Sequence, residues 1–128
     1  MTETVPVKKN EDHEEPVPSA WRQTFGEMVE ALREGNTQLR GIARVEPVDA
    51  PTAQVIARQI EDYGGIIAPL PEETWGTSVS QWQPDLTYWE VLVDLFTVED
   101  GLSDLVLHVM VHEHDGDFIF RPHLVYVP

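Results

Sequence analysis

The sequence predicts an α+β protein in which two amino-terminal helices pack on one face of a carboxyl-terminal antiparallel β-sheet of three to five strands. Two segments before residue 64 repeat apolar residues at helical spacing, whereas the last third of the chain alternates apolar and polar residues. The pair Asp115-Gly116, between two alternating segments, is typical of a two-residue β-hairpin turn. These three observations together predict the fold class.

Residues 1–18 are expected to form a disordered, acidic, proline-containing tail. They hold three prolines and a charged run at 8–15, and valines are their only sizeable apolar residues besides Met1. So little apolar surface does not offset the entropy of ordering the chain. Residues 19–128 are expected to fold as a single domain, because domains commonly run to about 100–150 residues.

The first predicted helix runs from about residue 20 to residue 34, with Ser19 as its N-cap and Gly35 just beyond its end. Its apolar residues fall at i, i+4, i+8 and i+11, which places them on one face of a helix. The face that we expect to pack on the sheet is formed by Trp21, Phe25, Val29 and Leu32.

The second predicted helix begins near Pro51, with Asp49 or Thr52 as its cap, and ends at Gly64-Gly65. Its buried face is formed by Ala53, Ile56, Ile60 and Tyr63. Between the two helices, residues 42–45 are compatible with a short strand.

The strands follow the second helix. The apolar run 66–70 is either a strand or a packed connection, because its prolines do not fit a regular central strand. Residues 77–82 alternate weakly and are expected to form an edge strand. Clear strand patterns cover 88–97, 104–114 and 118–127.

A two-residue turn at Asp115-Gly116 determines the register of the last two strands. The pairs that it predicts are His114 with Asp117, Val111 with Phe120, Val109 with Pro122, Leu107 with Leu124, and Leu105 with Tyr126. Pro122 cannot donate a hydrogen bond to a neighbouring strand, so we expect an open side or a bulge there.

The turn near Gly101 leaves two registers to compare. A two-residue turn on Asp100-Gly101 would place Glu90 and Asp94 in the core, where carboxylates need partners. A loop longer by an odd number of residues, with Gly101 left-handed, avoids this cost and is preferred. It places on the core face Trp89, Val91, Val93 and Leu95.

Several stretches resemble one known family: Leu70–Trp75, Leu92–Thr97 followed by Glu99–Leu105, and the ending Val125–Pro128. Together they resemble a family of small bacterial proteins catalogued as a domain of unknown function, over roughly residues 19–128. The resemblance implies a stand-alone bacterial domain and brings no activity or catalytic residue. Size, charge and class are also similar to those of immunity proteins that neutralise bacterial toxins, without a shared motif.

Composition excludes several classes of function. Eight Lys and Arg against 23 Asp and Glu give a net charge of −15, which disfavours binding to nucleic acids and to anionic membranes. The chain has no cysteine, so disulfides, thiolate nucleophiles and cysteine-based metal sites are excluded. Neither a signal peptide nor a membrane span is evident, and we expect a cytoplasmic protein.

The charge favours a non-enzymatic protein-binding module that captures a basic protein, in the manner of an immunity-like inhibitor. No cofactor is expected for this function. The residues that we expect to contact the partner are acidic side chains at the hairpin turns and one exposed tryptophan. They are Glu99, Asp100, Asp104, Asp115, Asp117 and Trp82.

The alternative function is metal binding or metal-dependent catalysis on the polar face of the sheet. The preferred registers place Asp94 near His108, His108 near His123, and Glu90 near His112. Two imidazoles and a carboxylate suit Zn²⁺ or Fe²⁺, but the same residues also suit a pH-responsive or simply solvated sheet face. A third hypothesis is a homo-oligomer formed through the proline-interrupted last strand.

Overall fold

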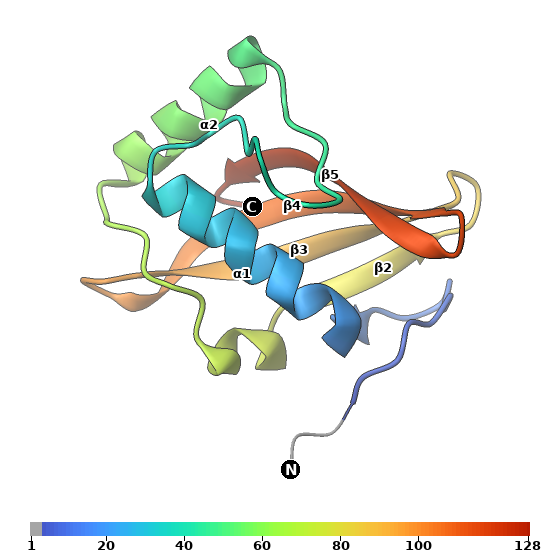
Figure 1. Ribbon diagram of the computed structural model, residues 1–128. Helices are drawn as coiled ribbons and strands as arrows, with labels where there is room; N and C mark the ends of the chain where they lie inside the picture. The colour runs from blue at the N-terminus through green and yellow to red at the C-terminus, as the bar shows by residue number, and fades with distance from the viewer. Residues whose placement is uncertain (1–3) are drawn as a thin grey trace.

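The computed structural model describes residues 4–128 and confirms the predicted α+β class (Figure 1). Two helices, α1 (Ser19–Arg33) and α2 (Ala50–Tyr63), pack with a five-stranded, entirely antiparallel sheet of order β1-β2-β3-β4-β5, in which β1 precedes α1 and the other four strands follow α2. The remaining elements are β1 (Glu15–Pro16), the 3-10 helix η1 (Glu72–Gly76), β2 (Val79–Gln83), β3 (Tyr88–Thr97), β4 (Gly101–His114) and β5 (Asp117–Tyr126).

Helix α1 lies across one face of the sheet (Figure 1), and its predicted apolar stripe is buried. The prediction that Ser19 caps this helix is wrong, because α1 begins after Pro18 and has no side-chain cap. The Ser19 hydroxyl instead accepts a hydrogen bond from the backbone N–H of Val5 at 2.7 Å. The serine therefore ties the amino-terminal segment to the start of α1.

Helix α2 has the ends that the sequence predicts. The Asp49 carboxylate accepts a hydrogen bond from the backbone N–H of Thr52 at 2.8 Å, which satisfies one of the free donors of the first turn. Gly64 ends the helix with a φ of 88°, a left-handed conformation that glycine adopts without strain. Ala53 and Ile56 are buried, and α2 packs against β5.

Residues 4–18 differ from the prediction of a disordered tail, because they pack along the sheet; residues 1–3 of that predicted tail lie outside the described residues. Residues 15 and 16 pair with Ser80 and Val79 as strand β1, and Val17 is fully buried. The Trp89 indole N–H donates to the carbonyl of Lys8 at 2.9 Å. Several partners that hold this segment belong to the sheet and others to the start of α1, so its own low apolar content does not reveal them.

The core centres on an aromatic cluster between α1 and the sheet. The Trp21 ring lies 5.3 Å from that of Trp89 and 5.2 Å from that of Phe118, both edge-on. Phe25 meets Phe120 in the same way at 5.5 Å. Edge-to-face pairs of this kind are worth about 0.5–1.5 kcal/mol each beyond the area they bury, so they hold α1 firmly on β3 and β5.

The hairpin between β4 and β5 has the predicted turn. Both central residues have positive φ, 49° at Asp115 and 78° at Gly116, as a type I′ turn requires. The three pairs nearest the turn that the sequence predicts are confirmed: His114 with Asp117, Val111 with Phe120, and Val109 with Pro122.

Beyond Pro122 the predicted register is wrong by one residue. Val109 lies opposite Pro122 but His108 lies opposite Leu124, so His123 is an extra residue in β5. This is the bulge that Pro122 predicts. Because of it Leu107 pairs with Val125 rather than Leu124, and Tyr126 pairs with Val106 rather than Leu105. Tyr126 therefore moves from the core face to the opposite face.

The preferred core face of β3 is confirmed. Trp89, Val91, Val93 and Leu95 are each at most 1% exposed, and Gly101 has a φ of 74°. The loop is short, since Thr97 pairs with Gly101, and the register then shifts between Asp94 and Phe96. The residues that alternate with these along β3 point to the other side of the sheet, away from α1. We call that side the open face.

The free side of β5 is partly covered by the connection between the helices. The Phe120 N–H donates to the Arg44 carbonyl, and the Glu46 N–H donates to the Phe120 carbonyl, both at 2.9 Å. The short strand predicted at 42–45 is thus reduced to one parallel bridge between Val45 and Phe120.

Deleting residues 1–10 should leave a folded protein that is less stable by about 1–3 kcal/mol, because hydrogen bonds and half-buried valines are lost from the sheet. Urea unfolding followed by tryptophan fluorescence measures the change, and a red-shifted emission of the folded state should report Trp82 and Trp89. Deleting only residues 1–3 is the matched control. An unchanged midpoint and spectrum would show that the segment does not pack.

Candidate functional site

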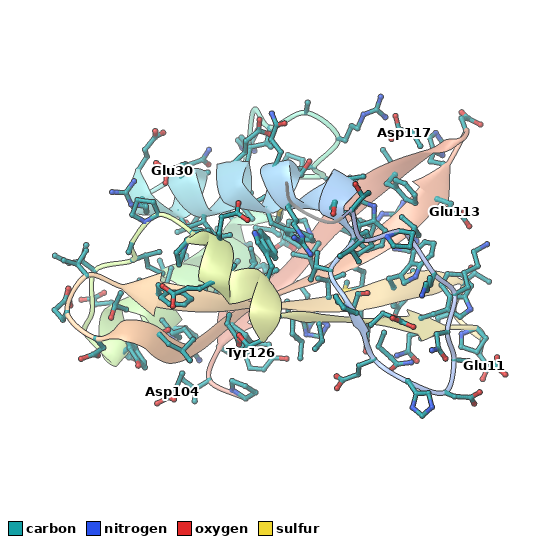
Figure 2. All side chains as sticks on the ribbon, turned by 90° about the horizontal axis from the view of Figure 1, so that it is seen from below. Glu11, Glu30, Asp104, Glu113, Asp117 and Tyr126 are labelled. Carbon is teal, nitrogen blue, oxygen red and sulfur yellow. The ribbon has the colours of Figure 1, made fainter. Side chains whose placement is uncertain are left out.

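The predicted partner-binding acids lie in two groups at opposite ends of the sheet. Glu99, Asp100 and Asp104 lie at the β3–β4 turn, and Asp115 and Asp117 lie at the β4–β5 turn. Strand β4 has 14 residues, so the two turns are on the order of 40 Å apart. Figure 2 shows Asp104 and Asp117 at opposite ends of the molecule. These acids do not form one continuous surface.

Two of these carboxylates are already engaged inside the protein. Glu99 accepts hydrogen bonds from the backbone N–H of Ile66 at 3.0 and 3.2 Å. Asp117 forms an ion pair with Arg44 at 2.7 Å. Both contacts hold loops on the sheet. These two acids therefore stabilise the fold, a role that the sequence alone does not reveal.

Trp82 is the least buried of the four tryptophans, as predicted, but it is half-buried rather than free. Its ring lies 4.5 Å from that of Trp89, and the Lys9 ammonium lies 5.1 Å from its centroid. Lys9 also pairs with Glu113 at 2.7 Å. The amino-terminal segment therefore covers the side chain that we expected to serve as an anchor.

The predicted metal ligands are only partly brought together. The rings of His108 and His123 are 5.0 Å apart, which confirms their predicted proximity. The pairing of Asp94 with His108 is wrong, because Asp94 lies opposite Val106 and His108 lies opposite Leu92. Across residues 4–128, no three His, Asp or Glu side chains are grouped so that they could hold a metal ion.

Side-chain hydroxyl groups support the irregularity in β3. The Thr74 hydroxyl of η1 donates to the Asp94 carbonyl at 2.6 Å, and the Asp94 N–H donates to the Ser78 hydroxyl at 2.9 Å. Ser103 donates to the Leu95 carbonyl at 2.7 Å. Three buried hydroxyls thus satisfy backbone groups near the point where regular pairing shifts, and Ser78 has this structural role.

His108 lies at the centre of a small pocket on the open face. Its Nδ1 is 3.0 Å from the Tyr126 hydroxyl, and its Nε2 is 3.9 Å from a Glu90 carboxylate oxygen. Burial lowers the pKa of His108 below its ordinary value of 6.5, His123 lowers it further, and Glu90 opposes this effect. His108 is therefore neutral at pH 7.

The pairing of Glu90 with His112 is also wrong. Glu90 lies opposite Met110, and the His112 ring lies 5.0 Å from that of Tyr88. Burial and the nearby Arg121 lower the pKa of His112, while Glu46 opposes them. His112 thus has surroundings separate from those of the neighbouring pair His108 and His123, so the three histidines do not form one cluster.

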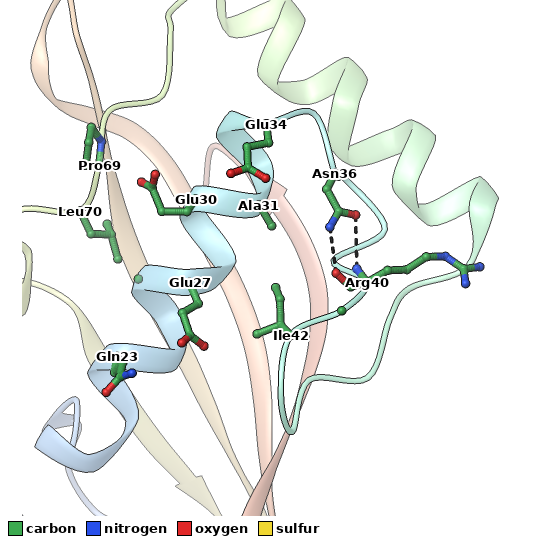
Figure 3. A pocket seen from close by; sticks show the side chains of 12 residues that line it. Gln23, Glu27, Glu30, Ala31, Glu34, Asn36, Arg40, Ile42, Pro69 and Leu70 are labelled. Carbon is green, nitrogen blue, oxygen red and sulfur yellow. Dashed lines mark hydrogen bonds between the residues drawn. The ribbon is translucent and has the colours of Figure 1, made fainter.

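A second hollow, which we call the α1 groove, lies over the exposed face of α1. Its volume is about 630 Å³, and it is bordered by residues 36–42 on one side and 69–70 on the other (Figure 3). Glu27 and Glu30 of α1, and Glu34 at the C-cap of this helix, point into it. Their i, i+3, i+7 spacing in the sequence places them on one face of a helix, but the predicted binding residues do not include them.

Half-buried apolar side chains flank these carboxylates in the α1 groove, among them Ile42 and Leu70. Two hydrogen bonds between Asn36 and the backbone of Arg40, at 2.9 and 3.3 Å, hold the loop on that side (Figure 3). Glu30 also pairs with Arg33 at 2.6 Å. The groove therefore has three carboxylates against one lining cation, Arg40, together with apolar contact area.

Fold and geometry together define a small acidic α+β protein with a helix-covered antiparallel sheet, the α1 groove on one side of it and the His108 pocket on the other. The family model described as "Domain of unknown function (DUF7668)" matches residues 29–128. The chain therefore belongs to this family, which agrees with the resemblance seen in the sequence. No curated protein and no solved structure matches it significantly. Within residues 4–128, no helix has both the length and the apolarity needed to cross a membrane.

Stability should fall as the pH falls below about 6.5, in part because of His108. Its folded-state pKa is lowered, so between that pKa and its ordinary value of 6.5 the unfolded chain binds more protons than the folded one. The stability is present above this window and is lost within it. Melting temperatures at pH 7.5 and 5.5 should differ less in His108→Gln than in the wild type.

The exposed hairpin residue His114 provides the matched control for this measurement. Its side chain is 67% exposed, so His114→Gln should keep the wild-type pH dependence. An identical fall in melting temperature for wild type and His108→Gln would contradict the assignment of His108 as a buried neutral group.

Proposed function

We propose that this protein is a non-enzymatic protein-binding module that captures a basic partner through the α1 groove. The observation that carries the proposal is the line of Glu27, Glu30 and Glu34 along a groove with apolar flanks. The first and last of these lie about 10 Å apart along the axis, two helical turns, at 1.5 Å per residue. A basic amphipathic helix with cations two turns apart fits this spacing.

The net charge of −15 supports the same class of partner. A field of this sign draws cationic surfaces into encounter and disfavours nucleic acids and anionic lipids. The apolar flanks would add affinity that does not depend on charge. Burial of Leu70 and Ile42 against the partner would contribute binding free energy that salt does not screen. An immunity-like inhibitor in the bacterial cytoplasm is one form of this proposal, and it rests on size, charge and fold class.

The groove takes the place of the hairpin acids in this proposal. Those acids lie at two distant turns, and Glu99 and Asp117 are held by internal contacts. The groove instead gathers its carboxylates on one rigid helix. Helices position side chains more reproducibly than turns do, and this favours α1 as the binding element.

The test uses a labelled synthetic helix of Leu and Lys, with lysines two turns apart, and measures its binding by fluorescence anisotropy at low and physiological salt. Glu27→Gln/Glu34→Gln should weaken binding about 3- to 10-fold, because exposed ion pairs are individually weak. The matched control, Glu61→Gln/Asp62→Asn on α2, removes the same charge from another helix and should change affinity less than about 2-fold.

Two further variants test whether the partner binds at the α1 groove or at the β3–β4 turn. Leu70→Ser should weaken binding equally at both salt concentrations, because it removes apolar contact rather than charge. A loss confined to Asp100→Asn/Asp104→Asn would place the partner at the β3–β4 turn and contradict the groove. If Glu27→Gln/Glu34→Gln and the α2 control weaken binding equally, the effect is one of net charge alone. This outcome would also contradict binding at the α1 groove.

A further inference from the structure

The pocket around His108 lies on the open face, away from the α1 groove, and has a volume of about 260 Å³. Side chains from β2, β3, β4 and β5 build it, and Glu14 of the amino-terminal segment completes its rim. The apolar part of the wall is formed by Val79 and Leu92. This volume is below that of most drug-sized ligand sites, so only a small group fits.

An unpartnered polar atom faces this pocket. The Nε2 of His108 is buried from solvent and has no hydrogen-bond partner, and the nearest Glu90 oxygen is 3.9 Å away, beyond hydrogen-bonding distance. Leaving a buried polar atom unpaired is costly, so such atoms in folded proteins are rare. A ligand that bonds to Nε2 would remove this cost.

The tautomer of His108 determines which kind of ligand fits at Nε2. When Nδ1–H of His108 donates to the Tyr126 hydroxyl at 3.0 Å, Nε2 carries a lone pair and accepts. Glu90 and Glu14 add carboxylate oxygens, which only accept when ionised. The amide nitrogen of Gln81 is used by the carbonyls of Asn10 and Trp82, which leaves its oxygen as an acceptor.

No lysine or arginine is among the residues that line this pocket. The pocket is therefore rich in acceptors, negatively charged and lined in part by aliphatic carbon. Anionic ligands would meet two carboxylates and no cation, and neutral apolar ligands would leave the acceptors unpaired. A small cation with N–H donors satisfies both the charge and the hydrogen bonds.

We propose that this pocket binds a primary ammonium group on a short aliphatic chain, with the nitrogen bridging Glu90 and His108. A nitrogen about 2.9 Å from both acceptor atoms is compatible with their separation of 3.9 Å. The aliphatic chain would lie against Val79 and Leu92. The ligand is a free alkylamine or the lysine side chain of another protein, and the proposal does not depend on the α1 groove.

An organic cation fits better than a metal ion. Glu90 and His108 offer two ligands, and no group of three potential ligands occurs within residues 4–128. Protein metal sites generally use at least three side chains, whereas an ammonium group needs two or three acceptors.

The test is a titration of the ¹⁵N-labelled protein with n-butylammonium chloride at pH 7, followed by amide chemical shifts. We expect saturable shifts at residues of the pocket, with a Kd on the order of 1 mM, as suits a ligand of so few atoms. n-Butanol and n-butyrate, of similar size, should produce no saturable shifts. Nα-acetyl-lysine-N-methylamide should shift the same residues if a lysine side chain fits.

Two variants make the result specific. Glu90→Gln should weaken n-butylammonium binding about 10-fold or more, because it removes the ionised acceptor. Asp94→Asn, on the same strand and face but outside the pocket, should bind within about 2-fold of wild type. Dispersed amide spectra show that both variants are folded.

Three outcomes would overturn the proposal. They are an absence of saturable shifts with n-butylammonium, equal weakening by the two variants, and pocket shifts with Zn²⁺ but not with the amine. If the free amine binds and the lysine derivative does not, the ligand is a free alkylamine and the lysine source is excluded.

Discussion

The packing of Trp21 between β3 and β5 is the interaction on which the rest of the structure depends. Its ring meets Trp89 on one strand and Phe118 on the other, so a single side chain determines where α1 lies on the sheet. Once one face of the sheet is covered, strict alternation sends every second residue to the open face. The position of His108, and the acidic side of α1 that faces solvent, both follow from this one contact.

Periodicity was enough to predict the helices, the three long strands and their core face. The backbone conformation of Asp115-Gly116 determines the β4–β5 hairpin, and the Asp49 cap lies three residues from the group that it binds, so both features depend on residues close in sequence. The amino-terminal segment could not be predicted in this way. Its partners, such as the Trp89 indole and the β2 backbone, lie more than 60 residues away in sequence.

The candidate sites were harder to predict because two small irregularities control them. The extra residue His123 in β5 turns Tyr126 toward His108. The short loop between Thr97 and Gly101, together with the irregularity between Asp94 and Phe96, places Asp94 opposite Val106 rather than His108. Pro122 signals the first irregularity. The second depends on the hydroxyls of Thr74 and Ser103, which bond to backbone groups that alternation does not identify. A pattern of period two predicts faces well, but it does not predict which neighbours meet across strands.

Both edges of the sheet are covered along part of their length: the two-residue strand β1 pairs with β2 at one edge, and residues 44–46 cover part of β5 at the other. An exposed strand edge is a template on which a second chain can add, and this is how many β-proteins aggregate. Here Pro122 and its bulge further interrupt the β5 edge. The chain is thereby protected against intermolecular strand pairing, and growth of ordered aggregates would first require residues 15–16 or 44–46 to detach.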